Sequence, residues 1–298
     1  MYEQIAANKR RTVLLILGFM LLVAGVVVAI NLVTGGGVVG FVIAAVLAIG
    51  MSVASYYNSD KVALAMSRAR PADPREYARY HNLVEGLCIA SGLPKPRLYI
   101  VDDPAPNAFA TGRNPKHSAV AVTTGLLEKM NRVELEGVLA HELSHIKNYD
   151  ILVMTIAVTL VGIVALLSDF FLRFMFWGGS RRSDRNNPLG GVLALLGIVL
   201  LIFAPIIARV MQLAVSRRRE YLADASGVSL TRYPPGLISA LKKLKGDTTV
   251  ISSASKATAH LWIEEPLDTE HANASTRFNR LFATHPPLDD RIAVLEAM

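Results

Sequence analysis

The chain has 298 residues, and its 31 lysines and arginines against 24 acidic residues give a formal net charge of +7. A mean hydropathy of +0.38, with 52% hydrophobic and only 18% charged residues, excludes an ordinary soluble enzyme. The positive charge lies beside apolar segments, and no basic motif interleaved with aromatic residues predicts binding to nucleic acid. The single cysteine, Cys88, excludes a disulfide within the chain and fits a reducing compartment.

Two uncharged apolar segments, 12–33 and 38–56, lie near the start of the chain. The first is long enough to cross about 30 Å of hydrocarbon, and the second is just long enough. Residues 1–57 therefore predict a transmembrane hairpin. Positive residues flank both ends of this hairpin while its turn is uncharged, so we expect both ends in the cytoplasm. The flanking residues are Lys9, Arg10, Arg11, Lys61, Arg68, Arg70 and Arg75.

The stretch 58–150 predicts the first part of a cytoplasmic domain, with a helix over 74–90 beside a small sheet. The strands of this sheet are expected at 97–101, 107–112 and 118–123. An edge strand in the middle of this stretch could hold an extended peptide by backbone hydrogen bonds, so we expect part of it to bind substrate. The residues concerned are Asn107, Ala108, Phe109 and Ala110. An ordinary hairpin strand without this role is the alternative.

The stretch His141-Glu-Leu-Ser-His145 ends the same domain segment and carries two histidines four residues apart. A helix is predicted here, because Asn131 and Glu134 fit a capping box and apolar residues follow at helical spacing. Two imidazoles at this spacing point the same way and can share one zinc ion. Glu142 is then placed to take a proton from a water molecule. The alternative is a pair of ordinary surface histidines.

A second hydrophobic hairpin is predicted over 151–215, formed by segments 151–172 and 189–215. Each segment can cross a bilayer, since proline and charges near helix ends are tolerated in membrane helices. The connecting loop carries four arginines, which the positive-inside rule would not place outside, so a hairpin that does not cross is the alternative. These are Arg173, Arg181, Arg182 and Arg185.

A catalytic zinc needs a third protein ligand, which we expect after this hairpin. The glycine and histidine of the metzincin pattern do not follow His145, so a glutamate on a later helix is the other common solution. Glu220 and Asp224 share one face of a predicted helix. We expect Glu220 to bind the metal and Asp224 to accept a hydrogen bond from a ligating histidine. The alternative is a solvated acidic pair that balances Arg217, Arg218 and Arg219.

Four motifs follow one another in the chain: NAFATG at 107–112, HELSHIKNYD at 141–150, REYLAD at 219–224 and THPPLDDRIAVLE at 284–296. Together with the apolar segments, they closely resemble the HtpX membrane metalloproteases, gluzincins related to the type I CAAX prenyl proteases. The resemblance implies zinc ligands and a catalytic glutamate at the positions proposed above. It also implies that His285 and Arg291 lie near the zinc, where they can stabilise the oxyanion of a tetrahedral intermediate.

The sequence thus predicts an α-helical integral membrane protein with an α+β zincin-like cytoplasmic catalytic domain, built from 58–150 and 216–298. We expect a zinc-dependent endopeptidase with one Zn²⁺ per chain, a multi-pass protein of the bacterial plasma membrane. The resemblance implies ATP-independent quality control under stress, with polypeptide substrates that are misfolded or damaged membrane proteins. One alternative is a CAAX prenyl-processing protease, for which the apolar segments are few. The other is a catalytically silent scaffold, against which the intact Glu142 argues.

Overall fold

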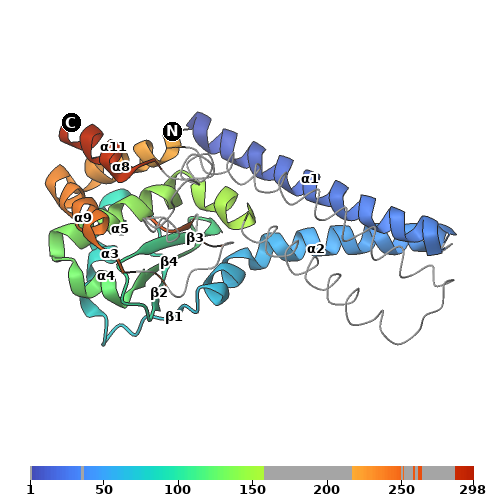
Figure 1. Ribbon diagram of the computed structural model, residues 1–298, viewed down its shortest axis with the longest axis horizontal. Helices are drawn as coiled ribbons and strands as arrows, with labels where there is room; N and C mark the ends of the chain where they lie inside the picture. The colour runs from blue at the N-terminus through green and yellow to red at the C-terminus, as the bar shows by residue number, and fades with distance from the viewer. Residues whose placement is uncertain are drawn as a thin grey trace.

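The computed structural model describes residues 2–34, 37–157, 217–249, 251, 258, 261–263 and 286–298. Two long helices, α1 (Tyr2–Thr34) and α2 (Gly37–Met66), form a hairpin. The hairpin projects from a part that contains a four-stranded sheet and the remaining described helices (Figure 1). The first turns of α1 reach back to this part, because the side chain of Asn8 bonds to Asp150.

The α1–α2 hairpin exposes large apolar side chains, with Leu21 75% and Val38 78% exposed. Nevertheless, none of the helices in the described ranges combines the length and the apolar character that crossing a membrane requires. Helices do form over 12–33 and 38–56, but the structure does not confirm either segment as a membrane span.

The sheet has the strand order β1-β2-β4-β3, so β3 lies at an edge among the described strands. β2 and β4 run parallel, whereas β1 pairs antiparallel with β2 and β3 pairs antiparallel with β4. The strands are β1 (Arg70–Pro71), β2 (Arg97–Val101), β3 (Ala108–Asn114) and β4 (His117–Thr123). The predicted sheet beside a helix is confirmed, and β1 is a strand that the sequence did not predict.

The central strand β4 is apolar along most of its length because both of its faces are buried. Side chains alternate between the two faces of a strand. Val120 and Val122 accordingly join one apolar cluster with residues of the helices, while Ala119 and Ala121 join a second cluster around Trp262.

Helices α3 (Ala78–Ser91) and α5 (Arg132–Lys147) contribute to the first of these clusters. Two further helices pack against α5 at close range, α8 (Arg217–Thr231) and α9 (Pro234–Gly246). A Cβ atom at Gly227 would lie 3.0 Å from the backbone nitrogen of His141, and one at Gly137 would lie 2.8 Å from that of Leu237. These glycines let α8 and α9 approach α5 more closely than larger residues would allow. The described part also contains the short helices α4 (Thr124–Lys129) and α11 (Leu288–Glu296), and residues 150–157 are helical as well.

Several predicted features lie outside the described residues. They are most of the segment 151–172, the segment 189–215, the loop with the four arginines, and His285.

Candidate metal centre

Helix α5 sets the positions of His141 and His145. Its N-terminus carries the predicted capping box, in which the side chain of Asn131 accepts from the backbone of Val133 and Glu134. In return, the carboxylate of Glu134 accepts a 2.8 Å hydrogen bond from the backbone of Asn131. The helix places the two imidazoles one turn apart on a buried face, with their Nε2 atoms 3.1 Å apart.

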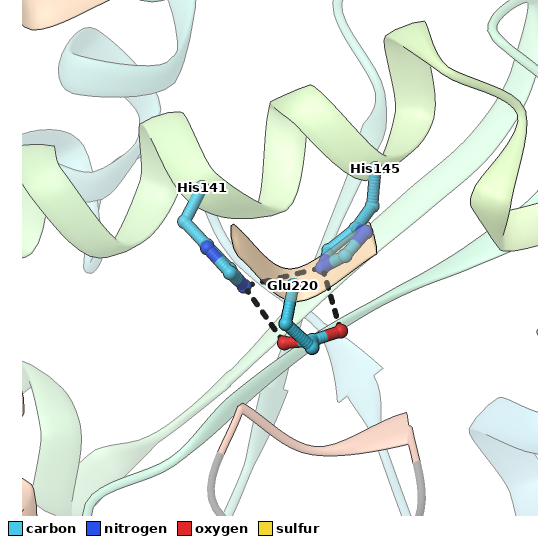
Figure 2. A group of neighbouring side chains, drawn as sticks. All are labelled: His141, His145 and Glu220. Carbon is cyan, nitrogen blue, oxygen red and sulfur yellow. Dashed lines mark hydrogen bonds and ion pairs between the residues drawn. The ribbon is translucent and has the colours of Figure 1, made fainter. Parts of the chain in front are cut away.

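Helix α8 brings Glu220 to the same point. Its Oε2 lies 3.7 Å from His141 Nε2, and its Oε1 lies 3.5 Å from His145 Nε2. Figure 2 shows the two imidazoles from α5 and this carboxylate converging. All three residues are buried, and one ligand atom from each lies within 4.8 Å of the others. The structure therefore brings together the three ligands that the sequence predicts, and their role in metal binding stays a prediction.

A carboxylate contacts the Nδ1 atom of each histidine. Asp224, one turn after Glu220 on α8, places Oδ1 2.8 Å from His141 Nδ1, as the predicted hydrogen bond requires. Asp150 Oδ2 lies 3.1 Å from His145 Nδ1, a contact that the sequence reasoning missed. A carboxylate that accepts a hydrogen bond from one ring nitrogen orients the imidazole and leaves the other nitrogen for a metal.

Asp150 reaches His145 because the chain turns sharply after α5. The helix ends at Lys147, and Tyr149 then adopts a left-handed conformation with φ 60°. A non-glycine residue in this region is uncommon. The only hint of this contact in the sequence is that Asp150 follows His145 by five positions. A continued α-helix would have placed Asp150 on a different face from His145.

Arg291 enters the site from α11 and is fully buried. Its guanidinium donates two hydrogen bonds to Asp224, of 2.8 Å from Nε and 2.6 Å from Nη2, and a third of 3.2 Å to the carbonyl of Ile263. A bidentate pair of this kind fixes the carboxylate as well as neutralising it. Arg291 thus lies near the predicted metal ligands, and its contacts orient Asp224. Its contact with an oxyanion stays a prediction.

A second polar cluster surrounds Asp150. Asn8 Nδ2 on α1 donates to Asp150 Oδ1 at 2.8 Å and to the carbonyl of Asn148 at 3.0 Å. Arg219 Nη1 lies 3.3 Å from both Asp150 Oδ1 and Asn8 Oδ1. All four residues are buried, so the first helix of the chain belongs to the hydrogen-bond shell of the candidate metal centre.

These contacts set the electrostatics of the site. Burial raises the pKa of Asp224, but Arg291 and His141 outweigh it and lower the value to about 2. Burial lowers the pKa of His145, yet Glu220, Asp150 and Glu142 together raise it to about 9. Glu142, which follows His141 on α5, is buried and contributes to this raised pKa. A metal ion would replace the proton on His145, since ligating histidines are neutral.

The strand next to this site is β3. The backbone nitrogen of Thr123 on β4 donates to the carbonyl of Asn107, so Asn107 and Phe109 direct their backbone groups to β4. Ala108, Ala110 and Gly112 then direct theirs to the outer edge. Ala108 accepts a 2.9 Å hydrogen bond from Ile263 there, and Gly112 donates at 3.1 Å to Thr155. The backbone of Ala110 lies between these two contacts. The side chain of Phe109 packs on Trp262.

Comparison with known proteins gives a consistent set of matches. The model of peptidase family M48 matches residues 74–298. The chain is 45% identical to a Protease HtpX homolog of Caldanaerobacter subterraneus subsp. tengcongensis, over 100% of this chain and 98% of the relative. Proteins of the same name from Tropheryma whipplei (strain Twist) and Listeria monocytogenes serotype 4a are 47% and 46% identical, again over 100% of this chain, and 98% and 100% of their own lengths are covered. The crystal structure of S. mikatae Ste24p has a TM-score of 0.49 and 18% identity, over 84% of this chain and 56% of that one.

Proposed function

Because the chain belongs to peptidase family M48 and is a metallopeptidase, we propose that His141, His145 and Glu220 hold one zinc ion for peptide-bond hydrolysis. The observation that carries this proposal is the buried convergence of two imidazole nitrogens and one carboxylate, all within 4.8 Å. Two nitrogen ligands and one carboxylate suit zinc and leave a fourth position for water or substrate. Bound there, zinc would supply Lewis-acid polarisation of a water molecule and of the scissile carbonyl.

Glu142 is the proposed general base. It follows His141 on α5, is buried, and acts electrostatically on His145. Its carboxylate removes the proton from the attacking water and then delivers it to the leaving amine. Asp224 and Asp150 hold the two imidazoles in the orientation that presents their Nε2 atoms, and Arg291 holds Asp224. His285 is proposed to stabilise the oxyanion with Arg291, on the family resemblance alone.

The edge of β3 is the proposed binding site for the substrate backbone. Asn107, Ala108, Phe109 and Ala110 make up this segment, and α5 packs against β3. At Ala110 the backbone amide and carbonyl point to the outer edge, so an extended peptide can pair with them as an added strand. Pairing through the backbone reads little side-chain sequence, which suits a protease of broad specificity.

We propose that the α1–α2 hairpin lies in the bacterial plasma membrane, with the metal centre on the cytoplasmic side. The exposed apolar side chains of the hairpin and the positive residues that flank it support this placement. Residues 58–150 and 216–298 would then form the catalytic domain, with 151–215 as a second hydrophobic hairpin. Misfolded or damaged membrane proteins are the proposed substrates. The comparisons do not favour a CAAX prenyl-processing protease or a silent scaffold.

The test is cleavage of a panel of membrane and soluble polypeptides by the purified full-length protein, with and without a zinc chelator. Glu142→Gln should keep its zinc but lose about 10²- to 10⁴-fold in rate, as expected for loss of a general base. Glu136→Gln on the same helix is the matched control and should cleave as the wild type does. Substantial cleavage by Glu142→Gln, or cleavage that the chelator does not stop, would contradict the proposal.

A further inference from the structure

A cavity of about 890 Å³ opens where the α1–α2 hairpin meets the rest of the described structure. Its walls come from α1, α2, the segment that follows α3, the end of β3 with the turn to β4, and residues that follow α5. None of the proposed zinc ligands lines it. Its volume lies in the range of sites that bind small molecules, which is about 300 to 1,000 Å³.

The charged side chains that line this cavity are cations. They are Lys9, Arg113 and Lys116, and no aspartate or glutamate is among its described lining residues. Lys9 Nζ lies 5.0 Å from the ring centre of Tyr149, and the guanidinium carbon of Arg113 lies 4.7 Å from that of Tyr57. Such contacts hold a cation in place without cancelling its charge. Within the described ranges, no ion pair joins the three cations to a carboxylate.

Apolar residues also line this cavity, and a second, mainly apolar cavity lies between the two helices. Val13 and Ile16 line the large cavity on its α1 side. Ile16 also lines a second cavity of about 210 Å³, in which Met20 of α1 faces Ile49 and other residues of α2. The two cavities share the lining residues Ile16 and Tyr56, so they adjoin. Together we call them the path, with cations in the large cavity and mainly apolar residues in the small one, its apolar end.

We propose that this path binds one anionic phospholipid. The headgroup phosphate accepts hydrogen bonds from Lys9, Arg113 and Lys116, and an acyl chain follows Ile16 into the space between α1 and α2. Inorganic phosphate would leave the apolar end unfilled, and an acidic peptide would place polar backbone there. The inference rests on the proposed contact of the hairpin with the bilayer.

Native mass spectrometry of the full-length protein in detergent, titrated with phosphatidylglycerol or phosphatidylcholine, tests this site. We expect one tightly bound phosphatidylglycerol that excess inorganic phosphate does not displace. Replacing Lys9, Arg113 and Lys116 together by glutamine should weaken binding about a hundredfold, since each cation contributes roughly a factor of five. The matched control replaces Lys61, Arg75 and Arg132 by glutamine, which changes the net charge equally but leaves the cavity intact.

The proposal is overturned if phosphatidylcholine binds as tightly, if the control loses as much affinity as the cavity variant, or if inorganic phosphate or an acidic peptide competes fully. Zinc affinity is measured on the same samples. Both triple variants should bind zinc as the wild type does, which shows that they are folded. Failure of the wild type to bind zinc would contradict the proposed function. The lipid proposal is decided by the phospholipid titrations alone.

Discussion

Asn8 on the first helix donates a 2.8 Å hydrogen bond to Asp150, and the other oxygen of this carboxylate lies 3.1 Å from His145 Nδ1. The contact joins residues 142 positions apart, and both are buried. Helix α1 therefore does more than project from the part that contains the sheet. Its first turns help to hold a carboxylate that orients a proposed metal ligand.

We expect Asn8→Ala to weaken zinc affinity by about 10- to 100-fold, the usual effect of losing a partner that orients a ligand. The measurement is zinc binding by competition with a chromophoric chelator. Asn58→Ala, an exposed asparagine on α2, is the control and should bind zinc normally.

A double-mutant cycle separates this role from a general effect on folding. If Asn8 acts through Asp150, the double variant Asn8→Ala/Asp150→Asn should lose less zinc affinity than the product of the two single fold-losses. For Asn8→Ala combined with Asp224→Asn, the two fold-losses should multiply. The cobalt-substituted Asn8→Ala protein should also show a shifted absorption spectrum. Wild-type zinc affinity in Asn8→Ala would refute the assignment.

The third ligand is tested by two variants on one helix face. Glu220→Ala removes a proposed ligand and should abolish stoichiometric zinc binding, whereas Asp224→Asn should weaken it by roughly 10- to 100-fold. Metal analysis of the purified proteins distinguishes the two. Full zinc occupancy in Glu220→Ala would mean that the ligand lies elsewhere in the chain.

The stability of the N-terminus of α5 should depend on pH through Glu134. Burial raises the pKa of this carboxyl, but hydrogen bonds from Lys243, Ser239 and the backbone of Asn131 lower it below its usual value. A carboxyl with a lowered pKa in the folded state stabilises the protein above its unfolded pKa, and the stabilisation is lost as the pH falls through the folded value.

Glu134→Gln should therefore destabilise the protein by about 1 kcal/mol at neutral pH, with a difference that shrinks once the pH falls below the ordinary glutamate pKa of about 4.3 and is lost as the carboxyl is protonated in the folded state. Thermal unfolding of the two proteins from neutral pH into the acidic range is the measurement. A constant difference at all pH values would rule out the ionised carboxylate as the source.

Cysteine labelling in intact cells tests the proposed topology. The native Cys88 gives a low background, because it is buried and burial raises its pKa to about 11. Cysteines placed at Lys61, Arg218 and Met298 should react only with a permeant reagent, while one at Val38, in the first turn of α2, should react from outside. Residues before and after 151–215 that label from opposite sides would exclude a shared metal site.

The sequence alone predicted the features that depend on residues close together in the chain. The positions of His141, Glu142 and His145 follow from the period of one helix, and the capping box at Asn131 shows where that helix starts. The spacing of Glu220 and Asp224 likewise follows from one helix turn. The strands over 97–101 and 118–123 could be predicted because alternation and β-branched residues are also local signals.

The tertiary structure alone determined the surroundings of these groups. Asp150 faces His145 only because Tyr149 takes a left-handed turn, and a local sequence pattern does not encode that choice. Asn8 and Arg219 meet although 211 positions separate them. The bidentate pair of Arg291 with Asp224 likewise joins two helices. Such contacts depend on how whole helices pack, which is a sum of many small interactions that no short stretch of sequence contains.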